Sequence, residues 1–413
     1  MSHPSPPDPN LVQPEPSPPP LSYSALFLRF LKFGALAFGG PVAQIAMLRR
    51  ELVEEEAWMS GQRFNRLLAV MQVLPGPEAH ELCVHLGMRA KGRWGGVLAG
   101  LGFMLPGFVL MMILSWLYFR IDFDHAWIGA GFLGVQAAVV ALILRAVHRI
   151  GQHILIDRWL WGVGLACAAA ALVGVSFWIT LPAAGIVYAL AVSGRRGWAL
   201  GIAALVVAAA VAARLSAPGP IARASLDFVV ASPGAVAPWI LFLSGLKAGL
   251  LTFGGAYTAI PFLRNDATAQ GWMGDGQFLD GLALSGVLPA PLIIFSTFVG
   301  YVAGGPLGAL AITAGVFMPA FAFSLVFYDR LETVVEMDGV KALLEGVAAG
   351  VVGLIAVTAL QLVISLFTPL SQTAVLGTIL AAAFTANWFW KSKLAPPVIL
   401  AAAGLVGVAL LRV

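Results

Sequence analysis

From residue 23 onward the chain is a succession of apolar stretches separated by short polar segments. A helix needs about 20 predominantly apolar residues to cross a bilayer. Lipid admits only helices and closed barrels as spanning structures, and no barrel-like alternation is visible here. The sequence therefore predicts an all-α polytopic membrane protein with about 10–13 transmembrane helices. The thirteen candidate stretches are 24–48, 67–87, 95–119, 127–147, 159–175, 178–193, 198–213, 237–262, 278–300, 306–328, 340–362, 369–385 and 395–411.

The scarcity of charge excludes other classes of protein. Only 11% of the 413 residues are charged, whereas 60% are hydrophobic. Soluble globular proteins carry about 25% charged residues, so this chain cannot cover a water-facing surface. A cytosolic enzyme, a nucleic-acid binder and a secreted scaffold are therefore excluded, and the lipid bilayer is the expected partner. The net charge of +4 fits basic cytoplasmic loops.

Residues 1–22 differ from the rest, because they contain nine prolines and no apolar run. This composition predicts a disordered Pro-rich tail with polyproline character. The tail lacks the basic start and apolar core of a signal peptide. Binding of an SH3-like partner is an alternative role for such a segment.

The chain repeats internally. Residues 31–40 read LKFGALAFGG and residues 246–255 read LKAGLLTFGG, with seven of ten positions identical. The segment LPGP at 74–77 similarly matches LPAP at 288–291. Further along, Pro106 has a counterpart in Pro319, and Gly95-Gly96 has a loose one in Gly304-Gly305. The pattern predicts two transporter repeats at 23–193 and 237–413, joined by a connecting helix and loop at 194–236.

The number of spans predicts the relation between the halves. Six spans per half and one connector would turn the second half over, which is the inverted-repeat plan of many secondary transporters. With the N-terminus inside, 15 of the 24 basic residues fall on inside loops or their edges. The loop at 49–66 has zero net charge and does not support this topology. Alternatively, 67–87 is a re-entrant hairpin bent at its Pro-Gly-Pro, and 278–300 could be the same.

Both repeats contain two kinds of helix-breaking motif. A Pro-x-Pro removes backbone donors and opens a new helix N-terminus, whose free N–H groups suit an anion. Adjacent glycines permit unusual backbone angles or close packing. The alternative role of these motifs is a packing kink or close helix contact. The breaks comprise Gly39, Gly40 and Pro41, Pro75, Gly76 and Pro77, Gly254 and Gly255, and Pro289 and Pro291.

Several polar residues lie beside these breaks. Lys247 lies about ten residues into its span and is the best candidate for attracting an anion, whereas its repeat counterpart Lys32 is closer to an end and could instead snorkel. The segment EAHELCVH at 78–85 is suited to gating or proton coupling, or is a satisfied interfacial patch. Its second histidine comes five residues after the first, which does not match a zinc protease motif. Other polar candidates are Gln44, Gln72, Asp266, Ser285, Ser296 and Thr297.

The sequence lacks the motifs of common enzymes. It contains no Gly-Lys-Ser/Thr phosphate loop, no catalytic triad signature and no metal-ligand spacing. The chain is therefore expected not to be an enzyme and to need no cofactor or metal. Any energy coupling would come from ion or substrate gradients.

At these motifs the sequence resembles the long-chain members of the chromate ion transporter family. The segments that carry the resemblance are FGALAFGGPVAQIAMLRRE, LLAVMQVLPGPEAHELCVHLG, WGGVLAGLGFMLPG, FLSGLKAGLLTFGGAYTAIPFLRNDA and FVGYVAGGPLGAL. Together they span roughly 24–363. The chain departs from common family patterns at Gln44, Glu78, Ala79 and His80. In the second repeat, Ala290 stands where a second Pro-Gly-Pro would have glycine.

The resemblance implies a secondary transporter in a prokaryotic inner membrane, exporting chromate and so conferring chromate resistance. Sulfate, a tetrahedral dianion of the same shape, is the related substrate. A homo-oligomer is compatible with the sequence. The alternatives are a permease for another small anion, a proton-coupled permease using Glu78 and His80, an intramembrane metal-dependent enzyme, and a scaffold recruited through the tail. The predicted substrate-binding residues are Lys247, Lys32, Gly39, Gly40, Pro41, Gln44, Gln72, Pro75, Gly76, Pro77, Glu78, His80, Gly254, Gly255, Pro289 and Pro291.

Overall fold

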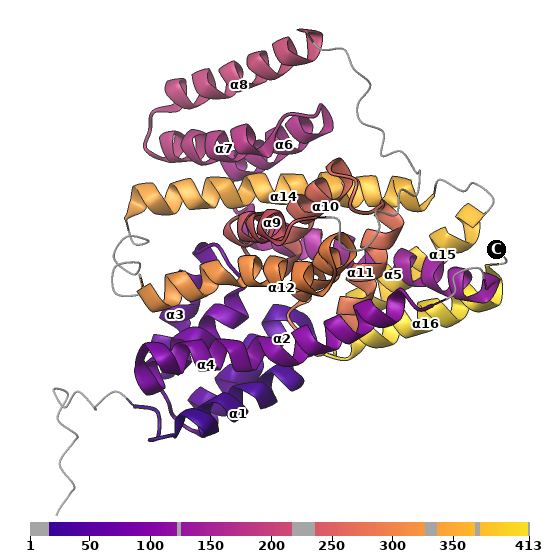
Figure 1. Cartoon of the computed structure of the whole chain (residues 1–413). Coiled ribbons are helices and arrows are strands. Elements are labelled where there is room, and N and C mark those ends of the chain that lie inside the picture. The colour runs from indigo at the N-terminus through magenta and orange to yellow at the C-terminus, as the bar shows by residue number, and fades with distance from the viewer. Residues whose placement is uncertain (1–15, 122–124, 217–235, 327–336, 368–371, 412–413) are drawn as a thin grey trace, which may run out of the picture.

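The computed structural model describes residues 16–121, 125–216, 236–326, 337–367 and 372–411 (Figure 1). Within these ranges every regular element is a helix, and none is a strand. The predicted all-α membrane fold is therefore confirmed. The prediction of a disordered tail at 1–22 concerns mainly residues 1–15, which lie outside the described ranges.

The two halves contain matching elements. The first half and the connecting helix comprise α1 (Tyr23–Ala35), α2 (Gly40–Leu48), the π-helix η1 (Arg49–Glu55), α3 (Gly61–Val73), α4 (Glu78–Tyr118), α5 (Ala126–Ile154), α6 (Arg158–Leu172), α7 (Phe177–Val192) and α8 (Arg196–Ser216). The second half comprises α9 (Pro238–Leu250), the 3-10 helix η2 (Ala256–Ala259), α10 (Ile260–Ala269), α11 (Asp275–Val287), the 3-10 helix η3 (Leu292–Ile294), α12 (Phe295–Val326), α14 (Asp338–Leu366), α15 (Thr373–Phe389) and α16 (Ala395–Leu410). Helices α1 and α9 both have 13 residues, as do α3 and α11, and α5 and α14 both have 29.

Four of the expected spans are broken helices. The spans expected at 24–48 and 237–262 are interrupted at the Phe-Gly-Gly motifs, and those at 67–87 and 278–300 at the Pro-x-Pro motifs. Gly39 and Gly40 have φ values of 90° and 78°, a left-handed backbone that side chains oppose. A 13-residue helix is only about 20 Å long, shorter than the ~30 Å hydrocarbon layer. The prediction of Pro-broken helices is confirmed.

Helices α4 and α12 each fold back on themselves. At Lys91 and Gly92 the backbone leaves the helical region, with φ values of −145° and 63°. A Cβ added at Gly96 would lie 2.9 Å from the Val84 carbonyl oxygen, whereas twelve residues of straight helix span about 18 Å. The same turn recurs at Gly304 and Gly305, with φ values of −137° and 63°. Each element is therefore a hairpin with a long second arm, at 93–118 and 306–326.

This turn corrects one detail of the sequence alignment. The sequence pattern pairs Gly95-Gly96 loosely with Gly304-Gly305. The backbone angles instead pair Lys91-Gly92 with Gly304-Gly305. The alignment offset falls to 213 beyond the Pro-x-Pro motifs, so the glycine pairs that look alike in sequence occupy different positions in the hairpin. The match of Pro106 with Pro319 agrees with this offset.

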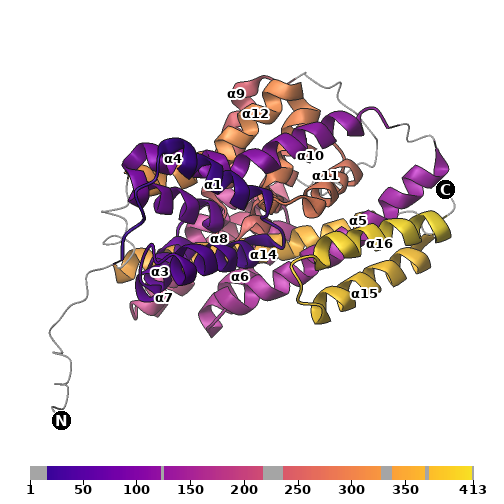
Figure 2. The ribbon, with the colours of Figure 1, turned by 90° about the horizontal axis from the view of Figure 1, so that it is seen from below.

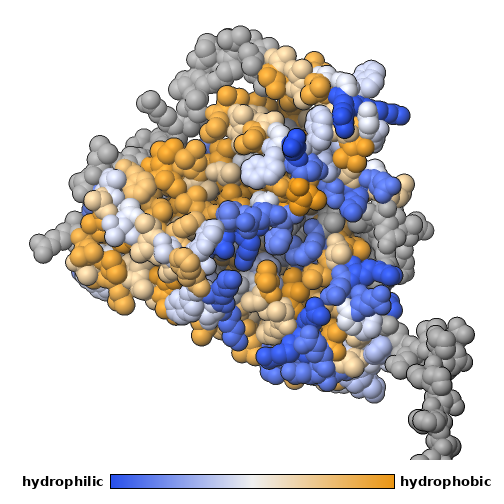
Figure 3. Space-filling model, turned by 180° about the vertical axis from the view of Figure 1, so that it is seen from behind, coloured by the Kyte–Doolittle hydropathy of each residue, from blue (hydrophilic) through white to orange (hydrophobic). Residues whose placement is uncertain are grey.

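Four helical elements of the described chain contain a stretch long and apolar enough to cross a membrane: the hairpins at Glu78–Tyr118 and Leu292–Val326, and the helices Trp127–Ile154 and Asp338–Leu366. Large apolar side chains such as Trp161, Leu165, Leu307 and Leu405 are more than half exposed. Figure 3 shows apolar side chains over most of one face, with hydrophilic ones gathered in a band across its middle and lower right. Such an extended apolar surface fits contact with lipid.

The two halves exchange their long helices. Helix α5 packs on α15 and α16 of the second half, and α14 packs on α6 and α7 of the first (Figures 1 and 2). Glycines make both contacts close. A Cβ added at Gly134 would lie 2.9 Å from the Cα of Gly407, and one at Gly346 would lie 2.9 Å from the Cα of Gly185. Small residues at helix crossings are the usual means of close packing in membranes. The hairpins α4 and α12 also pack on each other, so neither half stands alone.

Candidate functional site

Breaks from opposite halves meet inside the molecule. The Gly76 N–H, in the first Pro-x-Pro loop, donates a hydrogen bond of 2.8 Å to the carbonyl oxygen of Thr252. Thr252 immediately precedes the second Phe-Gly-Gly. The Thr258 hydroxyl accepts a bond of 3.1 Å from the Phe253 N–H and donates one of 2.7 Å to the Gly255 carbonyl. The structure thus brings Pro75–Pro77 beside Phe253–Gly255, and we call this contact the junction.

The breaks lie at the level of the middle of the long helices. A Cβ added at Gly249, near the end of α9, would lie 3.1 Å from Cγ of Pro319 on the long arm of α12. A Cβ added at Gly107, on the long arm of α4, would lie 3.5 Å from the Cα of Ala290 in the second Pro-x-Pro. Both contacts fall near the centre of an arm long enough to cross the bilayer. Substrate sites of inverted-repeat transporters lie at this depth.

A side chain bridges the helix break at the first Phe-Gly-Gly. Gln44 is buried, and its Nε2 donates a hydrogen bond of 2.9 Å to the Ala37 carbonyl across the break. A Cβ added at Gly39 would lie 2.9 Å from the Cα of Lys393, between α15 and α16. Pro41 lies in the first turn of α2. This break therefore faces the second half too, but at a different place from the junction.

The ionisable residues after the first Pro-x-Pro point inward. Glu78, His80, Glu81 and His85 are each less than 10% exposed. The His80 ring packs edge-on against Phe317 and Phe321 of α12, with centroid separations of 4.8 Å for each. The group therefore lies between the two hairpins. Among the described residues, no three His, Cys, Asp or Glu side chains are placed to hold a metal ion.

The two broken helices begin differently. Glu78 and Glu81 occupy the first turn of α4, where carboxylates complement the partial positive charge of the helix N-terminus. The helix after Pro289 and Pro291 begins with Leu292 and has no acidic residue in its first turn. The N-terminal end of the second broken helix is therefore free of carboxylates.

Lys247 forms a buried ion pair. Its ammonium contacts a carboxylate oxygen of Asp266, and the Ser244 hydroxyl donates to the other oxygen. The side chains of Lys247 and Asp266 are 16% and 8% exposed. Lys32 and Glu51 occupy the same positions in the first half, each 215 residues earlier. There the Nζ–Oε2 distance is 3.8 Å, and the Lys32 side chain is 63% exposed. We call the buried Lys247–Asp266 pair, which is in direct contact, closed, and the more exposed and more widely separated Lys32–Glu51 pair loose.

Arg149 is a residue that the sequence reasoning missed as a site candidate. It lies on α5, near enough to Glu78 on one side of the junction and to Tyr257 on the other for its charge to act on both. A Cβ added at Gly254 would lie 3.1 Å from Cδ1 of Ile154, one turn further along α5. Within the described ranges Arg149 shows no hydrogen bond or ion pair. In sequence it looks like a basic residue at a loop edge, and only the exchange of α5 between halves moves it to the junction.

Other polar groups lie apart from the junction. Asp280 accepts bonds of 2.7 Å from the Tyr118 hydroxyl and from Nε2 of Gln136, which ties α11 to α4 and α5. Arg264 pairs in two places with Asp275, at 2.8 Å each. Gln72 is exposed on α3 and belongs neither to the hydrogen bonds of Asp280 nor to the ion pair of Arg264.

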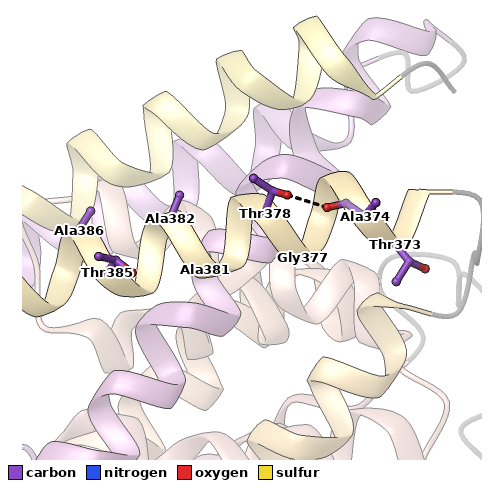
Figure 4. Close-up of a pocket in the computed structure, with 8 residues that line it drawn as sticks. All are labelled: Thr373, Ala374, Gly377, Thr378, Ala381, Ala382, Thr385 and Ala386. Atoms are coloured by element: carbon purple, nitrogen blue, oxygen red, sulfur yellow. Dashed lines mark hydrogen bonds between the residues drawn. The ribbon is translucent and has the colours of Figure 1, made fainter.

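A surface groove follows one face of α15 (Figure 4). Its lining is small and uncharged, including Ala374, Gly377, Thr378, Ala381 and Thr385. The Thr378 hydroxyl donates to the Ala374 carbonyl of its own helix, at 2.8 Å. The groove therefore offers no cation to an oxyanion.

Comparison with known proteins identifies the family. The family model described as "Chromate transporter" matches residues 24–195 and 239–408. The chain belongs to the chromate transporter family. The two matched ranges correspond to the two halves, and α8 lies between them. The family resemblance inferred from the motifs is confirmed, and the chain is a multi-pass membrane transport protein.

Three relatives show how far this family membership extends. A "Chromate transport protein" of Pseudomonas aeruginosa is 65% identical over 390 residues, covering 94% of this chain and 93% of its own. A "Chromate transport protein" of Cupriavidus metallidurans is 29% identical over 98% of both chains. A "Probable chromate transport protein" of Synechococcus elongatus is 30% identical over 94% of this chain and 96% of its own. No solved structure matches this chromate transporter family member.

Proposed function

We propose that this protein is a secondary transporter that exports chromate, or a related tetrahedral oxyanion such as sulfate, across the prokaryotic inner membrane and so confers chromate resistance. The relatives named as chromate transport proteins support the substrate. The observation that carries the mechanism is the junction, where broken helices of the two halves meet at mid-depth. The sequence contains no phosphate loop, so gradients supply the energy.

The proposed anion site lies beside the junction. Arg149 supplies a cation there, and Lys247 supplies a second one held by Asp266. Glycine N–H groups at Gly254 and Gly255, and the acid-free start of the helix after Pro291, supply partial positive charge. Gly39, Gly40, Pro41, Gln44 and Lys32 form the corresponding region of the first half. A planar guanidinium suits an oxyanion because it presents several donors in a fixed fork.

The two ion pairs provide the proposed switch between states. In an inverted-repeat transporter, the two halves exchange conformations as the site opens to one side and then the other. The closed Lys247–Asp266 pair and the loose Lys32–Glu51 pair are equivalent positions in different states. Opening the other side would loosen the first pair and close the second. Gly39, Gly254 and their neighbours would allow the backbone changes that this exchange needs.

A proton-coupled permease is the second candidate. The observation that favours it is the burial of Glu78 and His80 between the hairpins. A carboxylate beside a dianion site repels the anion unless it is paired or protonated. Proton uptake at this group would therefore favour anion binding.

Counterflow in proteoliposomes tests the proposed function. Purified protein is reconstituted in vesicles loaded with sulfate, and uptake of labelled chromate is followed. The proposal predicts saturable uptake that external sulfate inhibits. Protein that is folded by size-exclusion chromatography and circular dichroism, yet moves neither anion, would refute the oxyanion assignment. Inhibition by phosphate alone would point to a different anion.

A further inference from the structure

One buried carboxylate has no role in the proposed transport mechanism. Glu81 is 1% exposed, and neither of its carboxylate oxygens has a hydrogen-bond partner within the part of the chain that the structure describes. The carboxylate lies directly against Gly76, at the place where a Cβ of that residue would stand. The Gly76 N–H donates the hydrogen bond to the Thr252 carbonyl that joins the two sides of the junction. Glu81 is therefore packed against the contact between the halves.

The groups around Glu81 come from four elements. On its own helix, Glu78 repels it electrostatically, His80 directly precedes it, and His85 lies one turn later. From α12, the Ser324 hydroxyl donates to the Glu81 backbone carbonyl at 3.3 Å, not to its carboxylate. From α5, Arg149 interacts with Glu78, and the segment after α9 contributes the uncharged Thr252, which is bonded to Gly76. The positive charges of Arg63 and Arg89 act electrostatically on His85, which lies further along α4 than Glu81. None of these groups forms an ion pair with Glu81 in the described structure.

This environment suits a neutral acid and not an anion. A buried charge without a partner costs several kcal/mol, and ionisable residues inside membrane proteins commonly carry protons in coupled transport. The helix N-terminus offsets part of this cost, but Glu78 already occupies it and adds repulsion.

We propose that Glu81 is a proton-binding site that couples proton movement to anion transport. The carboxylate takes a proton from water on the side to which the junction is open, carries it while the junction is closed, and returns it to water on the other side. Because the neutral acid no longer repels a dianion, the proton and the anion are bound in the same state. This inference rests on the proposed transport function and extends it to the coupling ion.

Infrared spectroscopy tests the proton site without transport. Purified wild-type protein at neutral pH should show the carbonyl stretch of a protonated carboxylic acid, and this band should be lost in Glu81→Gln. Retention of the whole band in Glu81→Gln, or its absence from the wild type, would overturn the proposal. Glu55→Gln is the matched control, because Glu55 is exposed on η1 and should leave the band unchanged.

Proteoliposomes containing a pH-sensitive dye test the coupling. With the membrane potential clamped, a chromate gradient should move protons in the same direction as the anion in the wild type. In Glu81→Gln the protons moved per anion should fall at least about tenfold, and Glu81→Asp, which keeps the acid, should restore them. Equal proton movement in wild type and Glu81→Gln would overturn the inference. Absence of all anion flux in the wild type would instead refute the proposed function, while the infrared result would still decide whether Glu81 holds a proton.

Discussion

Lys247 and Asp266 neutralise each other inside the second half, and Ser244 completes the hydrogen bonding of the carboxylate. Removing one partner of a buried ion pair leaves an unpaired charge and costs about 3–5 kcal/mol. Lys247→Ala should therefore lower the melting temperature and abolish chromate flux. Lys247→Ala combined with Asp266→Ala should recover most of the stability but not the flux. Thermal unfolding and vesicle flux of both variants check this.

The first half provides the stability control for that pair. The Lys32–Glu51 pair is loose, and Lys32 is largely exposed. Lys32→Ala should change the free energy of unfolding by less than about 1 kcal/mol. If Lys32→Ala and Lys247→Ala destabilised the protein equally, the asymmetry between the halves would not be real.

Sequence reasoning identified the lysines but not their state. The repeat alignment places Lys32 and Lys247 together, and the mid-span position of Lys247 indicates a buried cation. It cannot show that Asp266 neutralises that cation, because the two residues are 19 positions apart across a break. Arg149 was missed for a similar reason, since its neighbours Glu78 and Tyr257 come from helices far away in sequence.

At the scale of the element, the first Pro-x-Pro loop depends on Gly76. Its φ is 146°, and a Cβ there would meet the Glu81 carboxylate. Gly76→Ala should destabilise the protein by about 1–3 kcal/mol and reduce flux, because the junction cannot close. Gly162→Ala on α6 is the control, since open space surrounds it. Melting temperatures of the two variants, measured side by side, check this, and equal values would contradict it.

The breaks themselves could be predicted from sequence, because proline and paired glycine act on the local backbone. The reversals of direction could be predicted as well, because the candidate spans at 67–87 and 95–119, and at 278–300 and 306–328, are separated only by short segments. The residues of the turns could not be predicted, because the turn at Lys91-Gly92 carries no proline and lies in a charged loop before the next span. The contacts of Val84 with Gly96 and Gly100 show how closely the two arms pack.

At the scale of the whole molecule, the halves are held together by exchanged helices. Gly134 packs on the backbone of Ala403 and Gly407, and Gly346 packs on that of Ala184 and Gly185. Because backbone cannot yield as a side chain can, Gly134→Val and Gly346→Val should each cost about 1–3 kcal/mol. Gly129→Val on the same helix as Gly134 has open space and serves as control. Thermal unfolding should rank both exchange variants below this control, and a loss in only one of them would contradict equivalent roles.

Equilibrium binding of labelled chromate to purified protein tests the central claim, that an oxyanion binds where the two halves meet. The wild type should bind chromate saturably, with sulfate as competitor. Arg149→Gln should weaken binding at least about tenfold, which corresponds to about 1.4 kcal/mol. Arg158→Gln, an exposed change at the start of α6, should bind like the wild type. Binding by folded Arg149→Gln that equals the wild type would contradict a site at the junction.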